Sequence, residues 1–495
     1  MKTINLLAID LGAESGRAIL GYFKAGALQL EEIHRFWNGP VRLPDGLHWD
    51  VLRLWTEIQH GLKQAAQRGP LGGVGLDTWG VDFALLDARD VLLGNPYHYR
   101  DSRTDLMMEE AFRRVSRADI FTSTGIQFMQ LNSLYQLLAM VVQHSPALEA
   151  AATFLTIPDL FNFWLTGRKA CEFTIATTTQ CYNPLTGDWA RPMLEQLGIP
   201  SHIFPAIVQP GTLLGDLAPG VAESLGMQPI PVIASACHDT ACAVAAVPAR
   251  GPDFAWISSG TWSIVGVDVP QPVMTPQARE YNLTNEGGVG ATFRLSRNVM
   301  GLWLVQECRR IWASQGDELS YDELTRLAEA AEPLRSIIDP DLPEFLKPGD
   351  MPARIRTACG DCGQPVPQEK GAVVRCILES IALKYRWVIE KLETLRGAPV
   401  ETIHIVGGGT RNRLLSQFTA DACGRTVVTG PVEATAIGNL SLQAVALGSL
   451  DSLDAARRVV RSCFENETFS PHLLRNTTAG DAWEAAYERF KKVAQ

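Results

Sequence analysis

Apolar runs that end in glycine or small polar residues recur along the chain, and this pattern predicts alternating strands and helices. The clearest case starts at Ile230, where a β-branched run leads into His238, Asp239 and Thr240 and an Ala-rich stretch follows. Such a pattern is typical of a strand that brings a carboxylate to the start of the next helix, where α/β enzymes expose a catalytic acid or base. Alternatively, Asp239 only caps that helix, because Asp is a favoured N-cap residue.

A related pattern opens the chain. Residues 5–10 (NLLAID) predict a strand, residues 12–17 (GAESGR) predict a turn, and residues 18–23 predict a second strand. A turn rich in Gly and small polar residues leaves backbone N–H groups pointing outward, which suits phosphate oxygens. Asp10 at its entrance can hold Mg²⁺ through water, because magnesium gives up its hydration reluctantly. The alternative is a plain hairpin with a surface Asp.

Residues 71–87 repeat this design with a different corner. A strand ends at Asp77, a corner of Thr78, Trp79 and Gly80 follows, and another strand begins. Residues 96–103 (PYHYRDSR) then place aromatic rings beside Arg and Asp. A polyol site needs both, because ring faces cover C–H groups and charged side chains bind hydroxyls. The same residues would also fit a surface loop with ion pairs.

The second half of the chain echoes the first. Residues 248–252 (PARGP) have the composition of a linker, so we place a domain boundary there, between residues 1–247 and residues 248–495. Residues 254–263 predict a strand, a Gly turn and a strand, as at the start of the chain. Two such turns suggest a duplication that holds a nucleotide between its halves, and a hinge near the linker.

Two further stretches of the second half carry candidate residues. Residues 404–412 predict a strand, a triple glycine and a polar helix start, and the missing side chains let backbone approach a flat ring or a phosphate. Residues 298–306 (NVMGLWLVQ) predict the start of a helix with two polar side chains, Asn298 and Gln306, among apolar ones. Those two side chains would equally suit the solvated face of that helix.

Composition limits the possible functions. The 495 residues are too many for one core and suit two or three domains. A net charge of −10 argues against nucleic acid as a main partner. No apolar run reaches the roughly 18 residues that span a bilayer, and the N-terminus has no signal-peptide cleavage site, so we expect no membrane partner and a cytoplasmic protein.

The ten cysteines are expected to be mostly free, buried thiols. The exception is the group of Cys359, Cys362 and Cys376, whose spacing would allow a disulfide. A zinc site is disfavoured, because no second pair of cysteines and no nearby His completes a tetrahedral set.

The order of these motifs resembles the actin-like, ribonuclease H-like ATPase superfamily, and more narrowly the FGGY carbohydrate kinases. The resemblance implies an α/β fold with two domains and an interdomain cleft, the N-terminal domain sugar-binding and catalytic and the C-terminal domain nucleotide-binding. It extends over nearly the whole chain. The segments that carry it are DLGAESGR (10–17), EIHRFWNG (32–39), DTWGVDFALLD (77–87), YRDSRT (99–104), ASACHDTA (234–241), SSGTWSIVG (258–266), NVMGLWLVQ (298–306), HIVGGG (404–409) and GPVEATAIGNL (430–440).

The resemblance also implies an activity: ATP-dependent phosphorylation, with Mg²⁺, of L-rhamnulose at its C1 hydroxyl, in L-rhamnose catabolism. Asp239 matches the general base of the family. Glu14 departs from the family, which commonly has a small Ser there, and a carboxylate near phosphates must point away or pair. The sugar-binding positions are matched by Gly80, His238, Asp239, Thr240 and Asn298. The ATP-binding positions are matched by Ala13, Glu14, Ser15, Gly16, Arg17, Thr261, Gln306 and Gly408.

Other functions stay open at this point. Another ketose, such as L-fuculose or a pentulose, could be the substrate. The same fold also supports ATPase switches, filament proteins and non-catalytic sugar or ATP sensors. The intact Asp10, Asp239 and glycine turns argue against a catalytically dead relative. The sequence leaves the oligomeric state open between monomer and dimer.

Overall fold

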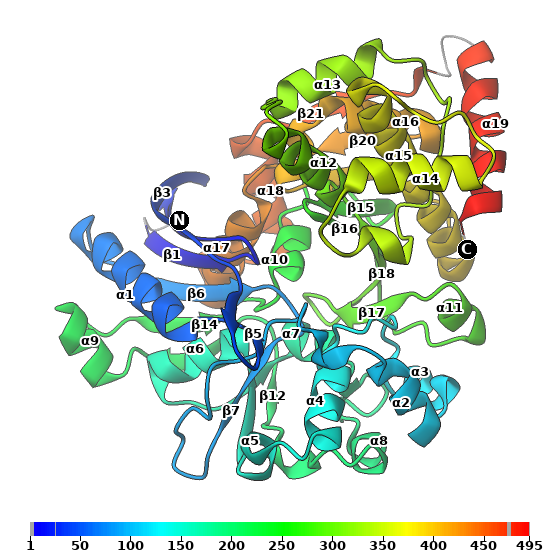
Figure 1. The fold of residues 1–495 in the computed structure, drawn as a ribbon. Helices are drawn as coiled ribbons and strands as arrows, with labels where there is room; N and C mark the ends of the chain where they lie inside the picture. The colour runs from blue at the N-terminus through cyan, green and yellow to red at the C-terminus, as the bar shows by residue number, and fades with distance from the viewer. Residues whose placement is uncertain (1–3, 25, 473–476, 495) are drawn as a thin grey trace. The chain divides into compact units, whose positions relative to one another are not determined.

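The structure is a computed structural model that describes residues 4–24, 26–472 and 477–494 (Figure 1). The chain divides into two compact units, each assembled from segments far apart in the sequence. The first unit comprises residues 1–246, 268–295 and 434–463. The second unit comprises residues 247–267, 296–433 and 464–495. The predicted cleft and the predicted roles of residues 1–247 and 248–495 stay predictions.

The first unit is built on a mixed sheet with the strand order β13–β14–β6–β1–β2–β3. Its central strands β1, β6 and β14 run parallel, whereas β2 pairs antiparallel with β1. Ligands of open α/β sheets bind beyond the carboxyl ends of parallel strands, so this edge is where a site is expected. The strands of this sheet are β1 (Ile4–Leu11), β2 (Ser15–Lys24), β3 (Ala27–Trp37), β6 (Gly73–Thr78), β13 (Thr212–Asp216) and β14 (Pro231–Ala234). Outside it, β7 (Phe83–Leu86) pairs with β8 (Thr153–Thr156), and β17 (Thr284–Gly287) lies next to β18 (Phe293–Met300).

Helices cover both faces of this sheet. Helix α1 packs on the face that carries Ala18, where Gly61 leaves no room for a side chain. Helix α17 packs on the opposite face, and α10 lies against α17 so closely that a Cβ at Gly438 would stand 1.8 Å from the carbonyl oxygen of Cys242. The helices are α1 (Val51–Gln67), α2 (Met107–Arg114), α3 (Arg117–Thr124), α4 (Ser133–Val142), α6 (Ile157–Thr166), α7 (Phe173–Ala176), α9 (Pro219–Leu225), α10 (Asp239–Ala245), α17 (Ala434–Ala446) and α18 (Leu453–Cys463).

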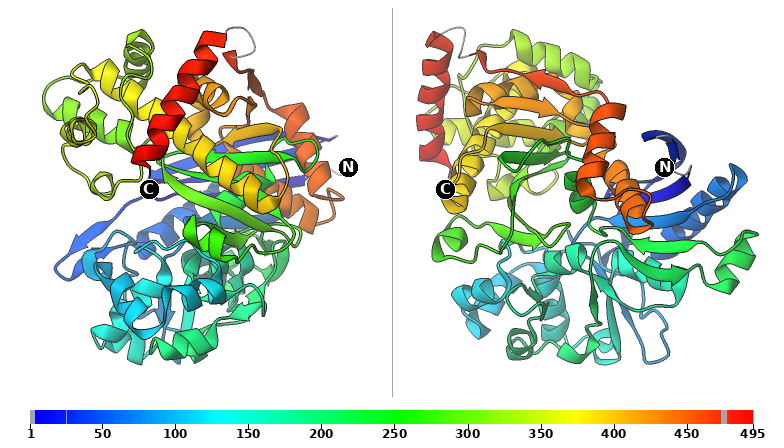
Figure 2. Two further views of the ribbon diagram at one scale, coloured as in Figure 1. Left: turned by 90° about the vertical axis from the view of Figure 1, so that its right-hand side faces the viewer. Right: turned by 180° about the vertical axis from the view of Figure 1, so that it is seen from behind.

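The second unit repeats the plan, with β19 paired parallel to a strand on each side. The strand order of its sheet is β17–β18–β16–β15–β19–β20–β21. Strands β15 and β16 form an antiparallel hairpin, and β15 and β20 both run parallel to β19. The 27-residue helix α15 packs beside α16 and α19, and Figure 2 shows α19 in red. The strands are β15 (Phe254–Ser259), β16 (Trp262–Val269), β18 (Phe293–Met300, which begins in the first unit), β19 (Thr402–Val406), β20 (Thr426–Thr429) and β21 (Glu467–Phe469). The helices are α12 (Trp303–Ser314), α13 (Tyr321–Ala330), α14 (Met351–Asp361), α15 (Lys370–Arg396), α16 (Arg413–Cys423) and α19 (Thr477–Val493).

Most predicted elements are confirmed, and one is wrong. The strand, polar triplet and helix after Ile230 are present as β14 and α10, and the strand and triple glycine of residues 404–409 are present as β19 and the turn after it. Asn298, however, lies on strand β18 rather than at a helix start, and the helix begins only at Trp303. The apolar spacing of this short stretch fits either state, and β18 pairing decides it.

The cysteines are free thiols, as expected. None of the ten cysteines forms a disulfide in the structure, and Cys359 and Cys376 lie closest, with their sulfur atoms 4.0 Å apart. Within the residues that the structure describes, no helix is both long and apolar enough to cross a membrane.

Candidate active site

Three carboxylates gather in the first unit at the carboxyl ends of its parallel strands. Asp10 and Asp77 are direct neighbours in the register of β1 and β6, and Asp239 starts the helix that follows β14. Asp10 and Asp77 are both buried. Burial, reinforced by the charges of Asp10 and Asp239, raises the pKa of Asp77 well above its usual range.

Asp239 is the first residue of α10, and its N-cap is His238, so the alternative that Asp239 is the N-cap is wrong. Its Oδ1 accepts hydrogen bonds from the backbone N–H of Thr240 at 2.5 Å and from the Thr240 hydroxyl at 3.1 Å. The side chain is 29% exposed, so a substrate can reach it. Burial raises the pKa of Asp239, with a further contribution from the charge of Asp10. A higher pKa makes this carboxylate a better proton acceptor near neutral pH.

The side chains of Arg17 and Asn38 hold the turn between β1 and β2 in place. Arg17 pairs with Asp10 across the hairpin, with 2.5 Å between Nη2 and Oδ2. The side-chain amide of Asn38 donates to the carbonyl of Gly12 at 2.7 Å, and its backbone N–H donates to the carbonyl of Glu14 at 3.0 Å. Glu14 itself is exposed. The two remaining predicted members, Ser15 and Gly16, open strand β2, and Ala13 lies in the turn.

The corner at Gly80 lies beside the same helix start. Thr78 pairs in a parallel bridge with His238, which brings the end of β6 to the beginning of α10. A Cβ at Gly80 would lie 3.2 Å from the hydroxyl of Thr178, so this corner is tight. Of the predicted sugar-binding residues, the first unit therefore brings together Gly80, His238, Asp239 and Thr240.

Two buried acids that sequence reasoning missed support this corner. Asp82 accepts hydrogen bonds from the indole N–H groups of Trp49 at 2.6 Å and Trp79 at 2.9 Å, and burial raises its pKa to about 6. Glu172 accepts from the backbone N–H of Cys237 at 2.9 Å, directly before the polar triplet. Neither acid stands out in the sequence, because only the fold shows which donors surround it.

In the second unit the two glycine turns meet. Gly407 adopts a φ of +88°, and a Cβ at Gly409 would lie 2.1 Å from the Ser259 hydroxyl, so the triple glycine packs directly against the turn between β15 and β16. A Cβ at Gly408 would meet nothing within 4 Å, which leaves its backbone open to a flat ring or a phosphate.

Two more predicted nucleotide-binding residues stand next to these turns. The carbonyl of Thr261 accepts from the backbone N–H of Trp303 at 3.2 Å, which ties the turn to the start of α12, and Gln306 lies in the first turn of that helix. The second unit therefore brings together Thr261, Gln306 and Gly408. Asn298 lies on β18 in this unit, apart in sequence from the other predicted sugar-binding residues.

A divalent cation would fit the carboxylates of the first unit through water. Oδ1 of Asp77 is buried without a hydrogen-bond partner in the structure, and Asp10 lies beside it in the register. Among the described residues, no three or more His, Cys, Asp or Glu side chains converge as a complete set of metal ligands. Magnesium usually keeps several waters and takes only one or two protein carboxylates, so Asp10 and Asp77 are the residues that would hold it.

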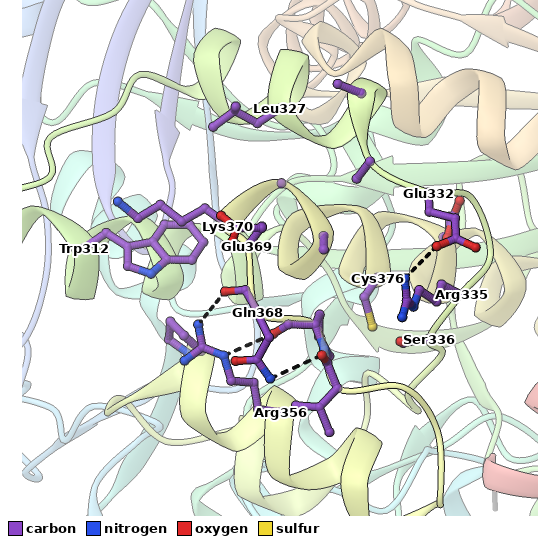
Figure 3. Close-up of a pocket in the computed structure, with 18 of the residues that line it drawn as sticks. Trp312, Leu327, Glu332, Arg335, Ser336, Arg356, Gln368, Glu369, Lys370 and Cys376 are labelled. Carbon is purple, nitrogen blue, oxygen red and sulfur yellow. Dashed lines mark hydrogen bonds and ion pairs between the residues drawn. The ribbon is translucent and has the colours of Figure 1, made fainter.

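A separate cavity of about 850 Å³ lies in the second unit, between α12, α13, α14 and the start of α15 (Figure 3). Its walls include Trp312, Arg356 and Lys370, and none of the residues predicted for the site is among its lining residues. Arg356 donates hydrogen bonds to the carbonyls of Pro367 and Gln368, so residues of the cavity wall already bind its guanidinium group.

The two sheets, with parallel strands at their centres and glycine turns at the strand ends, have the plan of the actin-like fold. Solved structures agree: a gluconate kinase from Lactobacillus acidophilus aligns with a TM-score of 0.83 at 17% identity, covering 99% of this chain and 98% of that chain. A Plasmodium falciparum glycerol kinase with ADP aligns with a TM-score of 0.78 at 17% identity, covering 99% of this chain and 98% of that one. At this identity the likeness shows the fold alone.

Sequence comparison identifies the family. Models of the N-terminal and C-terminal domains of the FGGY family of carbohydrate kinases match residues 5–246 and 255–447. The chain belongs to the FGGY family of carbohydrate kinases, which are ATP-dependent phosphotransferases, and the expected fold class is confirmed. It is 45% identical over 492 residues to a rhamnulokinase of Bacteroides thetaiotaomicron, covering 99% of both chains. It is 42% identical over 466 residues to a rhamnulokinase of Oceanobacillus iheyensis, covering 94% of this chain and 98% of that protein.

Proposed function

We propose that this protein is a rhamnulokinase that transfers the γ-phosphoryl group of ATP to the C1 hydroxyl of L-rhamnulose. The support for the activity is the similarity to rhamnulokinases, at 41–45% identity over nearly the full length. The observation that supports the chemistry is the position of Asp239: a partly exposed carboxylate at the end of a parallel strand, beside the buried Asp10 and Asp77.

In this proposal Asp239 takes the proton of the attacking hydroxyl. Its Oδ1 is engaged by Thr240, so Oδ2 is the atom assigned to the proton. The raised pKa of Asp239 favours proton uptake late in the transfer. Gly80, His238, Thr240 and Asn298 are assigned to the sugar, since amide, imidazole and hydroxyl groups bind hydroxyls directionally.

The second unit and the β1–β2 turn are assigned to the nucleotide. Residues 13–17 and Thr261 offer backbone N–H and side-chain donors for phosphate oxygens, and the open backbone of Gly408, with Gln306, suits the adenine and ribose. Asp10, with Asp77 beside it, would hold Mg²⁺ through water. When bound, the cation offsets the negative charge of the phosphates. We place the reaction in the cytoplasm.

The test of the base is Asp239→Asn. We expect kcat to fall by about 10²- to 10⁴-fold, the usual contribution of a general base, while the oxygen that Thr240 contacts is kept. Circular dichroism checks the fold, and the exposed Asp188→Asn is the matched control. Near-normal turnover by Asp239→Asn would refute the assignment.

The test of the substrate is a panel of ketoses assayed by ADP release, with ³¹P NMR of the product. The proposal requires L-rhamnulose to give the highest kcat/KM and a 1-phosphate. A higher kcat/KM for L-fuculose or a pentulose would reassign the substrate. ADP release without any sugar would favour an ATPase switch, and no phosphorylated product with any ketose would favour a sensor.

A further inference from the structure

Two buried charged side chains, Arg294 and Glu286, lie next to Nδ1 of His238 and have no part in the proposed mechanism. Arg294 lies on β18 and is 1% exposed, and Glu286 lies on β17. Arg294 Nη2 is 2.9 Å from Nδ1 of His238 and 3.1 Å from Oε2 of Glu286, and Nε of Arg294 donates to the carbonyl of Gly287 at 2.9 Å. Two anchors therefore hold the guanidinium against one ring nitrogen of His238.

This contact decides where His238 carries its proton. A guanidinium is always charged and only donates hydrogen bonds, so the Nδ1 atom that faces it must accept. Neutral His238 then carries its proton on Nε2, which lies 3.4 Å from Oδ1 of Asp239. Glu286 Oε2 also approaches Nδ1, but at the longer distance of 3.3 Å, and it is itself paired with the guanidinium of Arg294.

We propose that Arg294, anchored by Glu286, is a positioning residue for the phosphoryl transfer. It fixes His238 as the neutral Nε2–H tautomer, so that the Nε2–H group, and not a cation, faces Oδ1 of Asp239 at 3.4 Å. This inference rests on the proposed role of Asp239 as the base. An imidazolium at this position would stabilise the ionised carboxylate and weaken it as a proton acceptor. The contact of His238 Nδ1 with Arg294, which the sequence did not predict, thus keeps Asp239 a good proton acceptor.

The consequence is a pH profile that depends on a residue out of reach of the substrate. The charged groups that face His238 are Asp239, Glu286 and Arg294, and those that act on Asp239 also include Asp10. Without Arg294, no fixed donor faces Nδ1 of His238, and the carboxylate of Glu286 is the group that remains, 3.3 Å away. We therefore expect kcat to fall more steeply at acid pH when Arg294 is replaced.

The kinetic experiment compares Arg294→Met with Arg294→Lys. We expect Arg294→Met to lose at least about 10-fold in kcat at pH 6 relative to its own value at pH 8, beyond the loss of the unsubstituted enzyme. Arg294→Lys keeps the positive charge and should restore the acid limb, even where KM rises. The matched control is Lys384→Met, which breaks another fully buried ion pair, to Asp339, and should leave the shape of the profile unchanged. Equal losses at all pH values for Arg294→Met would overturn the proposal.

The tautomer can be read in the unsubstituted enzyme, without replacing Arg294. Long-range ¹H–¹⁵N spectra of the enzyme labelled at its nine histidines, assigned with His238→Gln, show which ring nitrogen carries the proton. We expect the Nε2–H pattern at pH 7.5, and an Nδ1–H pattern would overturn the proposal even if Arg294→Met fails to fold. The spectrum does not depend on whether Asp239 is the base. A failure of Asp239→Asn to lose activity therefore refutes the proposed base, whereas a wrong tautomer refutes this inference.

Discussion

Asp159→Asn should stabilise the first unit above neutral pH, although it removes a charged residue from a hydrogen-bonded network. Asp159 lies on α6 and is 3% exposed, and burial raises its pKa from 3.8 to about 7. Its Oδ1 accepts from the backbone N–H of Glu172 at 3.2 Å, and Oδ2 accepts from the Thr156 hydroxyl. An Asn side chain keeps the first contact, and the hydroxyl of Thr156 can rotate to accept from its amide.

The size of the effect follows from the two pKa values of Asp159. The folded protein holds the proton up to about pH 7, whereas the unfolded chain releases it near pH 3.8. Stability is therefore fully present below the unfolded pKa and is lost as the pH rises through the folded one. At about 1.4 kcal/mol for each pH unit, ionisation of Asp159 costs about 4 kcal/mol of stability by pH 8, of which roughly 2 kcal/mol is already lost at pH 5. The unsubstituted protein should lose about 2–3 kcal/mol more than Asp159→Asn between these pH values.

Urea unfolding at pH 5, 6, 7 and 8 measures this difference. The transition of the first unit is followed separately, because a chain with two units need not unfold in one step. Asp188→Asn, which changes an exposed carboxylate, is the control and should run parallel to the unsubstituted protein. Parallel curves for Asp159→Asn as well, or a variant that is less stable at pH 8, would refute the reasoning.

Three further substitutions test the packing and the second unit. Gly438→Val should lower Tm and cost at least about 1–3 kcal/mol, because the Cβ would stand 1.8 Å from a backbone oxygen of α10; an unchanged Tm would contradict the close packing. Gly409→Ala should raise KM for ATP at least several-fold more than KM for the sugar, because it displaces the triple glycine from Ser259; equal changes in both KM values would contradict this. Ser320→Ala removes a capping box from α13 and should cost about 1 kcal/mol in urea unfolding with kcat unchanged.

Local signals of the sequence were enough to place most of the elements that carry the site. The β-branched run before the polar triplet, the glycine turn after Asp10 and the triple glycine each combine a strand pattern with a turn residue, so neighbouring residues alone specify them. The helix predicted to start at Asn298 was wrong, because the sequence around Asn298 fits a strand and a helix equally well. Pairing of β18 in the sheet, a contact between distant residues, decided it.

The supporting contacts could not be predicted, because they join residues far apart in the chain. The return of residues 434–463 to the first unit places Asn439 against Asp77, with 2.6 Å between Nδ2 and Oδ2. The contact between Arg294 and His238 spans 56 positions. In both cases the residue types are ordinary, and only the fold makes them partners. A sequence motif can name the residue that touches the substrate, but the residues that tune it carry no local signature.

The cluster of Asp10, Asp77 and Asp239 accounts for the polar side chains of Arg17 and Asn439 that contact it. Asp10, Asp77 and Asp239 repel one another at the ends of the parallel strands, and the pairing of β1 with β6 keeps Asp10 and Asp77 side by side. Arg17 offsets part of this charge, and Asn439 donates to Asp77. The remaining repulsion is relieved either by a proton on Asp77 or by a bound cation. Under the proposed function, binding of a cation at Asp10 would therefore be coupled to the release of that proton.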